Sequence, residues 1–187
     1  MYVVNHQPDQ TVTARWQDYQ HYPNYQPSTA VRRWLLDRGS LTRHLQRQSC
    51  GHFAVQVLSQ GWQRPTGDEA RLLQRPLREQ AIIREVLLRC FGQPWVFARS
   101  VIPASSLDGR LRQLRYLSNR PLGQLLFNDP QMERDPFQLA LIGPRSRYLH
   151  SAVAVTGSVW GRRSRFVIAG KPLLVAEVFL PDFKPWT

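Results

Sequence analysis

The apolar positions along the chain predict two β-hairpins, at residues 81–103 and 160–181. In the first, the apolar segments 81–90 and 95–103 flank a Phe-Gly-Gln-Pro turn. In the second, an arginine-rich segment and the apolar run 173–180 flank a Gly-Lys-Pro turn. Apolar segments of this length, bounded by Gly and Pro, are typical of buried strands. The two hairpins together predict much of an antiparallel sheet.

Shorter patterns predict the elements around these hairpins. Ser28 and Ser40 each precede a segment with helical periodicity, so both are candidate N-caps, and Gly39 is expected to end the first helix. Pro121 interrupts a later helical region, because the residue before a proline disfavours helical backbone. The expected elements are a helix over 28–38, a helix over 41–47, a strand over 52–58, a polar loop over 63–76 and two helical pieces within 105–127.

The pattern predicts one domain with two less regular segments. Residues 1–27 are rich in Gln, Tyr, Pro and His and show little periodicity, so we expect a loosely attached, irregular N-terminal arm. Residues 28–187 form the single domain, a length that is sufficient for one hydrophobic core. Within it, residues 128–158 contain Asn-Asp-Pro, Asp-Pro and Gly-Pro sequences, which predict a lid-like or inserted segment with room for one short helix.

Glu177 lies in the middle of the most apolar segment of the chain. In a strand its side chain shares a face with Val175 and Phe179, and the other face is apolar as well, which indicates a strand covered on both sides. A carboxylate in such a place is costly unless it is paired or hydrogen-bonded. Arg84 and Arg99 occupy similarly apolar positions in the first hairpin, so the charges of both hairpins are expected to be buried.

The pattern leaves two interpretations of these charges open. One is a structural ion pair between neighbouring strands, which adds little stability because desolvation offsets much of the Coulomb attraction. The other is a closed apolar pocket with arginine at one end and a carboxylate at the other. Such a pocket suits a small, flat anion with a hydroxyl group opposite its acid group. Leu41 and Leu122 are each expected in the first turn of a helix, where free amides bind carboxylates.

A weak internal repeat relates the two hairpins. The second hairpin repeats GQPWVFARSVIP of the first as GKPLLVAEVFLP, with four identical positions. In this register Arg99 falls on Glu177 and Arg84 falls on Arg162. The repeat therefore predicts that Arg99 and Glu177 occupy equivalent inward positions.

Composition and charge narrow the classes of partner. The net charge of +12 and the sequence pI near 10.9 favour acidic partners: nucleic acid, anionic lipid or a small anionic substrate. Aromatic residues do not interleave with the arginines as a base-stacking surface would require, so we expect no nucleic acid. Weak association with an anionic membrane surface stays open. The five histidines lack metal-ligand spacing, so no metal site is expected.

The hydropathy of the chain predicts a cytoplasmic protein, and so do its N-terminal sequence and its cysteines. No apolar run approaches the roughly 18 residues that a membrane helix needs. The N-terminal sequence lacks the basic and apolar segments of a secretory signal. Cys50 and Cys90 are far apart and belong to no partner motif, so we expect reduced thiols.

Four segments of the chain carry a family resemblance. They are WLLDRGSLTRHL (34–45), IIREVLL with GQPWVFARSVIP (82–103), RPLGQLLF (120–127) and WGRRSR with GKPLLVAEVFLP (160–181). In this order they resemble the chorismate pyruvate-lyase family of ubiquinone biosynthesis. The C-terminal segment is the most specific of the four, and the common order makes a chance resemblance unlikely.

The resemblance implies a fold, a reaction and a set of site residues. The fold is α+β, with a single antiparallel sheet of about six strands, helices packed on it and flaps that close an internal ligand site. The reaction converts chorismate to 4-hydroxybenzoate and pyruvate, without metal or organic cofactor, in a cytoplasmic protein that we expect to be a monomer. The family's carboxylate-binding arginine matches Arg84, its catalytic-site glutamate matches Glu177, and its two backbone contacts match Leu41 and Leu122.

These implications leave one substrate group and one alternative function open. If Arg84 pairs with the ring carboxylate and Glu177 bonds the ring hydroxyl, the enolpyruvyl carboxylate needs a further cation. The candidates are Arg99, Arg162, Arg163 and Arg165. The alternative to an enzyme is a non-catalytic module of the same fold that binds small aromatic acids, like the effector domains of GntR-type transcription regulators. Residues 1–27 are too short and irregular for a DNA-binding helix-turn-helix, which disfavours this alternative.

Overall fold

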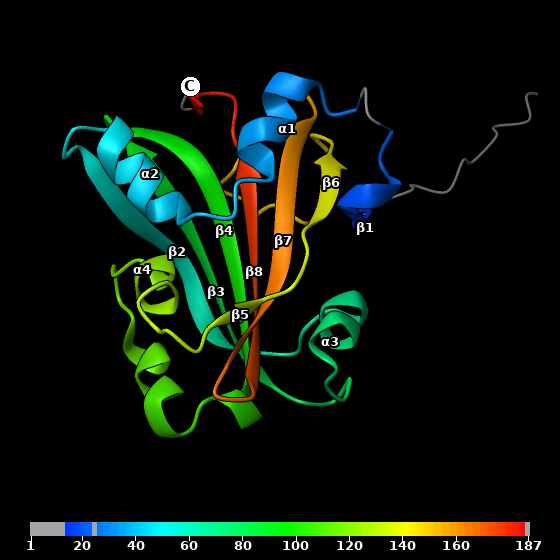
Figure 1. Cartoon of the computed structure of the whole chain (residues 1–187), viewed down its shortest axis with the longest axis vertical. Coiled ribbons are helices and arrows are strands. Elements are labelled where there is room, and N and C mark those ends of the chain that lie inside the picture. Colours follow the sequence, from blue (N-terminus) through cyan, green and yellow to red (C-terminus); the bar gives the residue numbers. More distant parts are fainter. Residues whose placement is uncertain (1–13, 24–25, 186–187) are drawn as a thin grey trace, which may run out of the picture.

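A computed structural model describes residues 14–23 and 26–185 (Figure 1). Within these residues, eight strands form one antiparallel sheet, to which helices are added in an α+β architecture. The strands run in the order β1-β6-β7-β8-β4-β3-β2, and β5 pairs with the second half of β7. The expected fold class is confirmed, whereas the expected number of strands was too low.

In the described part of the chain, the sheet has five long strands and three short ones. The long strands are β2 (Phe53–Gln63), β3 (Ala81–Cys90), β4 (Gln93–Pro103), β7 (Val159–Ile168) and β8 (Lys171–Phe179). The short strands are β1 (Gln17–Asp18), β5 (Glu133–Arg134) and β6 (Gln138–Ile142). The helices are α1 (Thr29–Leu35), α2 (Leu41–Gln48), α3 (Gly67–Leu73) and α4 (Leu122–Leu126), with 3-10 helices η1 (Tyr19–His21), η2 (Ala104–Ser106) and η3 (Gly109–Tyr116).

Both predicted hairpins are present and lie side by side. β3 pairs with β4 and β7 with β8, and β8 also pairs with β4, so the two hairpins form the centre of the sheet. Each hairpin turns through two residues with positive φ, Phe91-Gly92 and Ala169-Gly170. Positive φ at both central positions matches the type I′ turn, whose twist suits paired strands, and glycine adopts it without steric cost.

A β-bulge interrupts the pairing of β3 with β4. Leu88 pairs with Val96, whereas Arg89 pairs with Pro94, so Trp95 is an extra residue in β4. Trp95 and Val96 are consequently buried in the same apolar cluster. The bulge shifts the rest of the pairing by one residue, and such a shift turns every following side chain to the other face.

This shift overturns the prediction drawn from the internal repeat. Without the bulge, Arg84 would pair with Arg99, but the shifted register pairs Arg84 with Ser100. On β8, Glu177 pairs with the β4 residue just before Arg99, and it pairs with Arg162 of β7. Since directly paired residues share a face, Glu177 and Arg162 lie on one face and Arg99 on the other. Arg99 and Glu177 therefore do not occupy equivalent inward positions.

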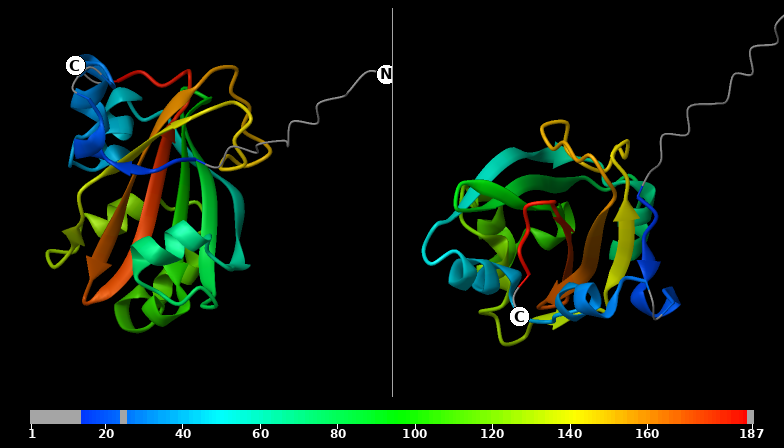
Figure 2. Two further views of the ribbon diagram at one scale, coloured as in Figure 1. Left: turned by 90° about the vertical axis from the view of Figure 1, so that its right-hand side faces the viewer. Right: turned by 90° about the horizontal axis from the view of Figure 1, so that it is seen from above.

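Helices cover both faces of the curved sheet (Figure 2). α1, α2 and α4 lie on the face that carries Glu177, and α3 lies on the opposite face, where Glu69 contacts Arg99. The segment of α3 was expected to be a polar loop. Its N-terminus is closed by a capping box, in which the Thr66 hydroxyl accepts from the Glu69 amide and the Glu69 carboxylate accepts from the Thr66 amide.

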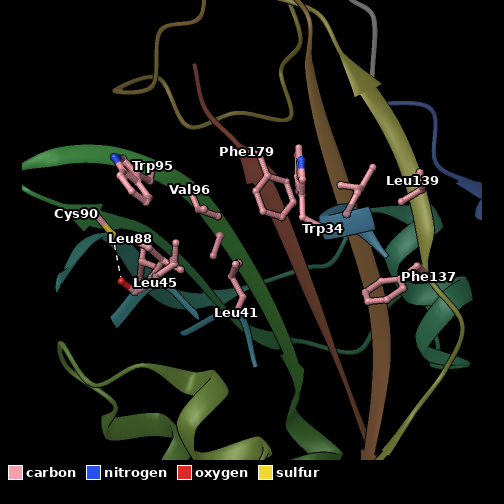
Figure 3. Packing of buried hydrophobic residues seen from close by; sticks show 13 residues of the cluster. Trp34, Leu41, Leu45, Leu88, Cys90, Trp95, Val96, Phe137, Leu139 and Phe179 are labelled. Atoms are coloured by element: carbon pink, nitrogen blue, oxygen red, sulfur yellow. Dashed lines mark hydrogen bonds between the residues drawn. The ribbon is translucent and has the colours of Figure 1, made fainter. Parts of the chain in front are cut away.

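The first two helices follow their predicted starts but not all of their predicted ends. The Ser40 hydroxyl caps α2 by accepting from the Arg43 amide at 3.4 Å, as expected. Ser28 precedes α1 without a side-chain cap, and α1 ends at Leu35 rather than near Gly39. Side chains from both helices form the largest apolar cluster with β3, β4 and β8 (Figure 3). Labelled examples are Trp34, Leu41, Leu45, Leu88 and Phe179.

The two less regular segments contribute to the sheet. Residues 128–158 contain β5 and β6 and no helix. The described part of the expected N-terminal arm contains β1 and η1, and residues 1–13 and 24–25 of that arm lie outside the described residues. Cys50 is exposed and Cys90 is buried, and neither forms a disulfide. Among the described helices, none is long and apolar enough to cross a membrane.

The ion pair that anchors α3 is expected to be important for stability. Glu69 is fully buried and binds Arg99 through both carboxylate oxygens, at 2.8 and 3.1 Å. We expect Glu69→Ala to lower the free energy of unfolding by about 3–5 kcal/mol, because it removes one partner of a buried pair. Asp108→Asn is the control, since its pair with Lys171 is exposed and such pairs contribute about 1 kcal/mol or less. Urea unfolding measures both, and equal effects would contradict this account.

Candidate active site

A pocket lies between the face of the sheet that carries Glu177 and the N-terminal ends of α2 and α4. Its empty volume, including the open mouth, is about 540 Å³. Strands β3, β4, β7 and β8 form one side, and residues of the two helices and of β5 form the other. The lining residues are Gly39, Leu41, Thr42, Arg84, Val86, Leu88, Ala98, Ser100, Pro121, Leu122, Gly123, Leu126, Phe127, Arg134, Arg162, Phe166, Val175 and Glu177.

The structure brings four of the five predicted site residues to this pocket. Arg84 and Glu177 reach it from different hairpins, because the shifted register places both on the same face. Leu41 and Leu122 are the first residues of α2 and α4, and both line the pocket. The first amides of a helix lack an intrahelical acceptor, so these two helix ends offer donors to an anion.

The two helix ends approach each other closely. A β-carbon added to Gly123 of α4 would lie 3.0 Å from the hydroxyl oxygen of Thr42 in α2. That distance is tighter than ordinary contacts of a β-carbon, so a residue larger than glycine would require the Thr42 side chain to give way. Gly123 thus lets two sets of free amides border one pocket.

Arg84 is a buried cation without a counter-ion. It is 2% exposed, and within the described residues it forms no ion pair. Its Nη2 donates to the carbonyls of Ser118 and Arg120 at 2.8 and 3.2 Å, while its Nε is buried without a partner. Burial lowers the pKa of Arg84 to about 10, which leaves the guanidinium charged at neutral pH. A buried charge in this state is stabilised by an anion that enters the pocket.

Glu177, in contrast, is held by Arg162. The Arg162 Nε donates to the Glu177 carboxylate at 2.6 Å. The Arg162 Nη1 donates to the carbonyls of Trp34, Leu35 and Asp37 at 2.8–3.3 Å, where α1 ends. Cations bind favourably at a helix C-terminus, because its last carbonyls lack partners. Arg162 therefore fixes the Glu177 carboxylate in place and leaves its remaining lone pairs for a donor in the pocket.

Arg99 lies outside the pocket, and so do two further arginines of the second hairpin. The Arg99 guanidinium binds Glu69 and Glu85 on the opposite face of the sheet. Burial alone would lower the pKa of Arg99, but its bonds to these two carboxylates raise it. Arg163 pairs with Asp68, and Arg165 pairs with Asp135 at 2.8 Å. The structure thus separates Arg99, Arg163 and Arg165 from Glu177 and provides each of them with a carboxylate.

Arg134 of β5 lines the pocket, and the sequence pattern did not point to it. Its guanidinium lies 4.1 and 4.8 Å from the ring centroids of Phe137 and Phe166, and its Nε is buried without a partner. Burial, together with nearby Arg162 and Arg38, lowers the pKa of Arg134 to about 9, against the opposing effect of Glu177. It forms no ion pair with any described residue. A two-residue strand has no periodicity from which this position could be read.

The arrangement suits a small, flat anion. The pocket is lined by apolar Val, Leu and Phe side chains. Its polar groups are two guanidinium groups without an ion pair among the described residues, one fixed carboxylate and two helix N-termini. Apolar pockets with few convergent polar groups are typical of small-molecule sites. Three or more His, Cys, Asp or Glu side chains do not cluster anywhere in residues 14–23 and 26–185, so no metal-ligand set is found there.

The different bonding of Arg84 and Arg162 predicts effects of different size on stability. Arg162→Met is expected to lower the free energy of unfolding by about 3–5 kcal/mol, because Glu177, whose side chain is 15% exposed, would lose its partner. Arg84→Met replaces an unpaired buried cation with an apolar side chain of similar volume. We therefore expect a change in the free energy of unfolding below about 1 kcal/mol in the unliganded protein. Chemical denaturation of both variants tests this. Destabilisation of similar size in the two would show that Arg84 already has a compensating partner.

The chain was compared with known proteins by sequence and by structure. A family described as chorismate lyase matches residues 11–186. A probable chorismate pyruvate-lyase of Methylococcus capsulatus is 46% identical over 152 residues, covering 79% of this chain and 93% of the relative. Another from Pseudomonas fluorescens is 48% identical over 162 residues, covering 86% of this chain and 83% of the relative.

A solved structure shows the same fold at low sequence identity. The effector domain of PhnF from Mycobacterium smegmatis matches with a TM-score of 0.57 and 16% identity, covering 81% of this chain and 94% of that one. Identity at this level shows the fold alone. The sequence matches, in contrast, extend over most of the chain at more than 40% identity. This chain therefore belongs to the chorismate lyase family.

Proposed function

We propose that the protein is a chorismate pyruvate-lyase, which converts chorismate to 4-hydroxybenzoate and pyruvate. The observation that carries this proposal is the buried Arg84 guanidinium, which faces the pocket without a counter-ion. Glu177, held by Arg162, lies in the same pocket and provides an acceptor. The relatives named as probable chorismate pyruvate-lyases support the same reaction. The product would be the aromatic acid with which ubiquinone biosynthesis begins.

The proposed binding mode uses the two ends of the ring. Arg84 pairs with the ring carboxylate, which also accepts hydrogen bonds from the amides of Leu41 and Leu122. The Glu177 carboxylate accepts a hydrogen bond from the ring hydroxyl, which lies opposite the ring carboxylate in chorismate. The apolar side chains between these groups contact the faces of the ring and exclude water.

The reaction is an elimination that makes the ring aromatic. The ring carbon that carries the hydroxyl loses its hydrogen as a proton. The bond between the neighbouring ring carbon and the ether oxygen breaks, and the released electron pair of the C–H bond forms the third ring double bond. The leaving enolate takes up a proton and becomes pyruvate. Only protons are transferred to and from the substrate, and no external oxidant or reductant is required. The protein's main tasks are therefore to orient the substrate and to place charges around it.

Further properties belong to the same proposal. We place the enzyme in the cytoplasm, acting as a monomer without added cofactor. The net charge of +12 supports weak association with anionic membrane surfaces, where the prenyl acceptor chemistry of the product takes place.

The first test mixes purified protein with chorismate, without added metal, and follows pyruvate and 4-hydroxybenzoate together. We expect equimolar products from the wild-type protein. Glu177→Ala and Arg84→Ala should each lower kcat/KM by at least about 100-fold, because each removes a charged group that orients the substrate. Circular dichroism of the variants controls for folding.

A folded wild-type protein without turnover would overturn the enzyme proposal. If that protein still bound 4-hydroxybenzoate in calorimetry, the pocket would belong to a non-catalytic module for aromatic acids. If Arg84→Ala retained full activity, the ring carboxylate would be bound elsewhere.

Glu177→Gln tests how the carboxylate acts. The amide keeps an acceptor for the ring hydroxyl and for Arg162, but it does not accept a proton. If Glu177 removes the ring proton, kcat should fall by about 100-fold or more while the dissociation constant of 4-hydroxybenzoate stays within about tenfold. Unchanged kcat would assign Glu177 to positioning alone.

A further inference from the structure

We infer that Arg134 binds the second carboxylate of the substrate, the one on the enolpyruvyl group that leaves as pyruvate. This inference rests on the proposed function, because it concerns the same pocket and the same substrate. Chorismate carries two carboxylates, and 4-hydroxybenzoate retains only the one on the ring. The residue that binds the other carboxylate should therefore matter for the substrate and not for this product.

The bonding of the other arginines leaves Arg134 as the available cation. Three arginines line the pocket: Arg84, Arg134 and Arg162. Arg84 is assigned to the ring carboxylate. The charge of Arg162 is already paired with Glu177, and its Nη1 donates to three carbonyls at the end of α1. Arg134 donates only one hydrogen bond, from Nη1 to the Arg38 carbonyl at 3.3 Å. Its Nε is buried without a hydrogen-bond partner, and its guanidinium forms no ion pair with any described residue, although Glu177 and Asp37 are near enough to raise its pKa.

The position of Arg134 fits the geometry of the substrate. In chorismate the ether is attached to the ring carbon next to the one that carries the hydroxyl. The enolpyruvyl carboxylate must therefore lie on the Glu177 side of the pocket, away from Arg84. Arg134 belongs to β5, which pairs with β7, the strand of Arg162, whereas Arg84 lies on β3 beyond β8 and β4. Consistent with this placement, Arg162 and Glu177 are electrostatic neighbours of Arg134.

The surroundings of Arg134 keep its guanidinium in a defined plane. The rings of Phe137, Phe166 and Phe127 lie 4.1, 4.8 and 5.9 Å from its central carbon. Aromatic faces attract a guanidinium and limit its rotation, yet they leave the N–H groups at its edge unpaired. A planar, partly desolvated fork of N–H donors is suited to a carboxylate, which it binds with two parallel hydrogen bonds.

This contact would assist the reaction as well as binding. When the ether bond breaks, negative charge moves onto the enolpyruvyl group. A guanidinium already bound to the carboxylate of that group stabilises the charge as it develops. Arg134 should therefore affect kcat in addition to KM.

The test compares chorismate with 4-hydroxybenzoate in Arg134→Gln. We expect kcat/KM for chorismate to fall by at least about tenfold, the size expected for a lost charged hydrogen bond. The dissociation constant of 4-hydroxybenzoate, measured by calorimetry, should stay within about threefold of the wild-type value, because the product lacks the second carboxylate. Arg84→Gln should weaken both, since both molecules carry the ring carboxylate.

Two further variants serve as controls. Arg165→Gln also removes an arginine of this half of the sheet, but Arg165 is paired with Asp135 and does not line the pocket, so both readouts should be unchanged. Arg134→Lys keeps the charge and loses the planar fork, so its loss in kcat/KM should be smaller than that of Arg134→Gln. Thermal unfolding confirms that each variant is folded, and the lysine variant carries the test if the glutamine variant is not.

The outcomes separate this inference from the proposed function. Wild-type kinetics in Arg134→Gln, or equal losses for chorismate and 4-hydroxybenzoate, would overturn the role of Arg134 while leaving the lyase intact. Absence of turnover in the wild-type protein would instead remove the proposed function. In that case the binding of unreacted chorismate to the wild-type and Arg134→Gln proteins still decides whether Arg134 recognises the second carboxylate.

Discussion

The bonds of one buried side chain, Arg162, determine the arrangement on which the pocket depends. Its guanidinium joins three parts of the chain: strand β7, which carries it, the Glu177 carboxylate of β8, and the final carbonyls of α1. These bonds satisfy groups that would be costly to bury alone. Without them, α1 would keep its apolar packing against the sheet but lose this polar link, and Glu177 would lose its ion pair. The position of the Glu177 carboxylate in the pocket thus depends on the same arginine that binds the C-terminal end of α1.

Charge on the two faces of the sheet is balanced in different ways. On the face with α3, Arg99, Arg163 and Arg165 each have a carboxylate within the protein. On the pocket face, one carboxylate pairs with Arg162, whereas Arg84 and Arg134 have no ion pair with any residue that the structure describes. The unliganded protein therefore keeps two cations in an unfavourable environment. The arginines of the two faces therefore differ in the presence or absence of a partner carboxylate, rather than in depth of burial.

The sequence predicted what depends on local periodicity and missed what depends on pairing between distant strands. Apolar runs predicted both central hairpins, and an isolated charge in such runs marked Arg84 and Glu177. The same signal marked Arg99, because no pattern distinguishes it from Arg84, and only the extra residue at Trp95 turns it to the other face. Arg134 reaches the pocket through a two-residue strand, which has no periodicity. The capping box of α3, in contrast, has a sequence pattern, Thr66 followed by Glu69 three residues later. This pattern could have predicted a helix where a loop was expected.

The arginines that face the pocket also hold the segments that cover it. The Arg84 guanidinium donates to the carbonyls of Ser118 and Arg120, just before α4. The Arg134 guanidinium donates to the carbonyl of Arg38, just before α2, and the Arg38 guanidinium donates to the carbonyl of Arg134. A molecule bound to Arg84 shares the donors of this guanidinium with the segment just before α4, so its release is coupled to the loosening of those bonds. Escape is then a gated event with its own barrier. The residence time of the product is then a step that can limit turnover as well as the elimination itself.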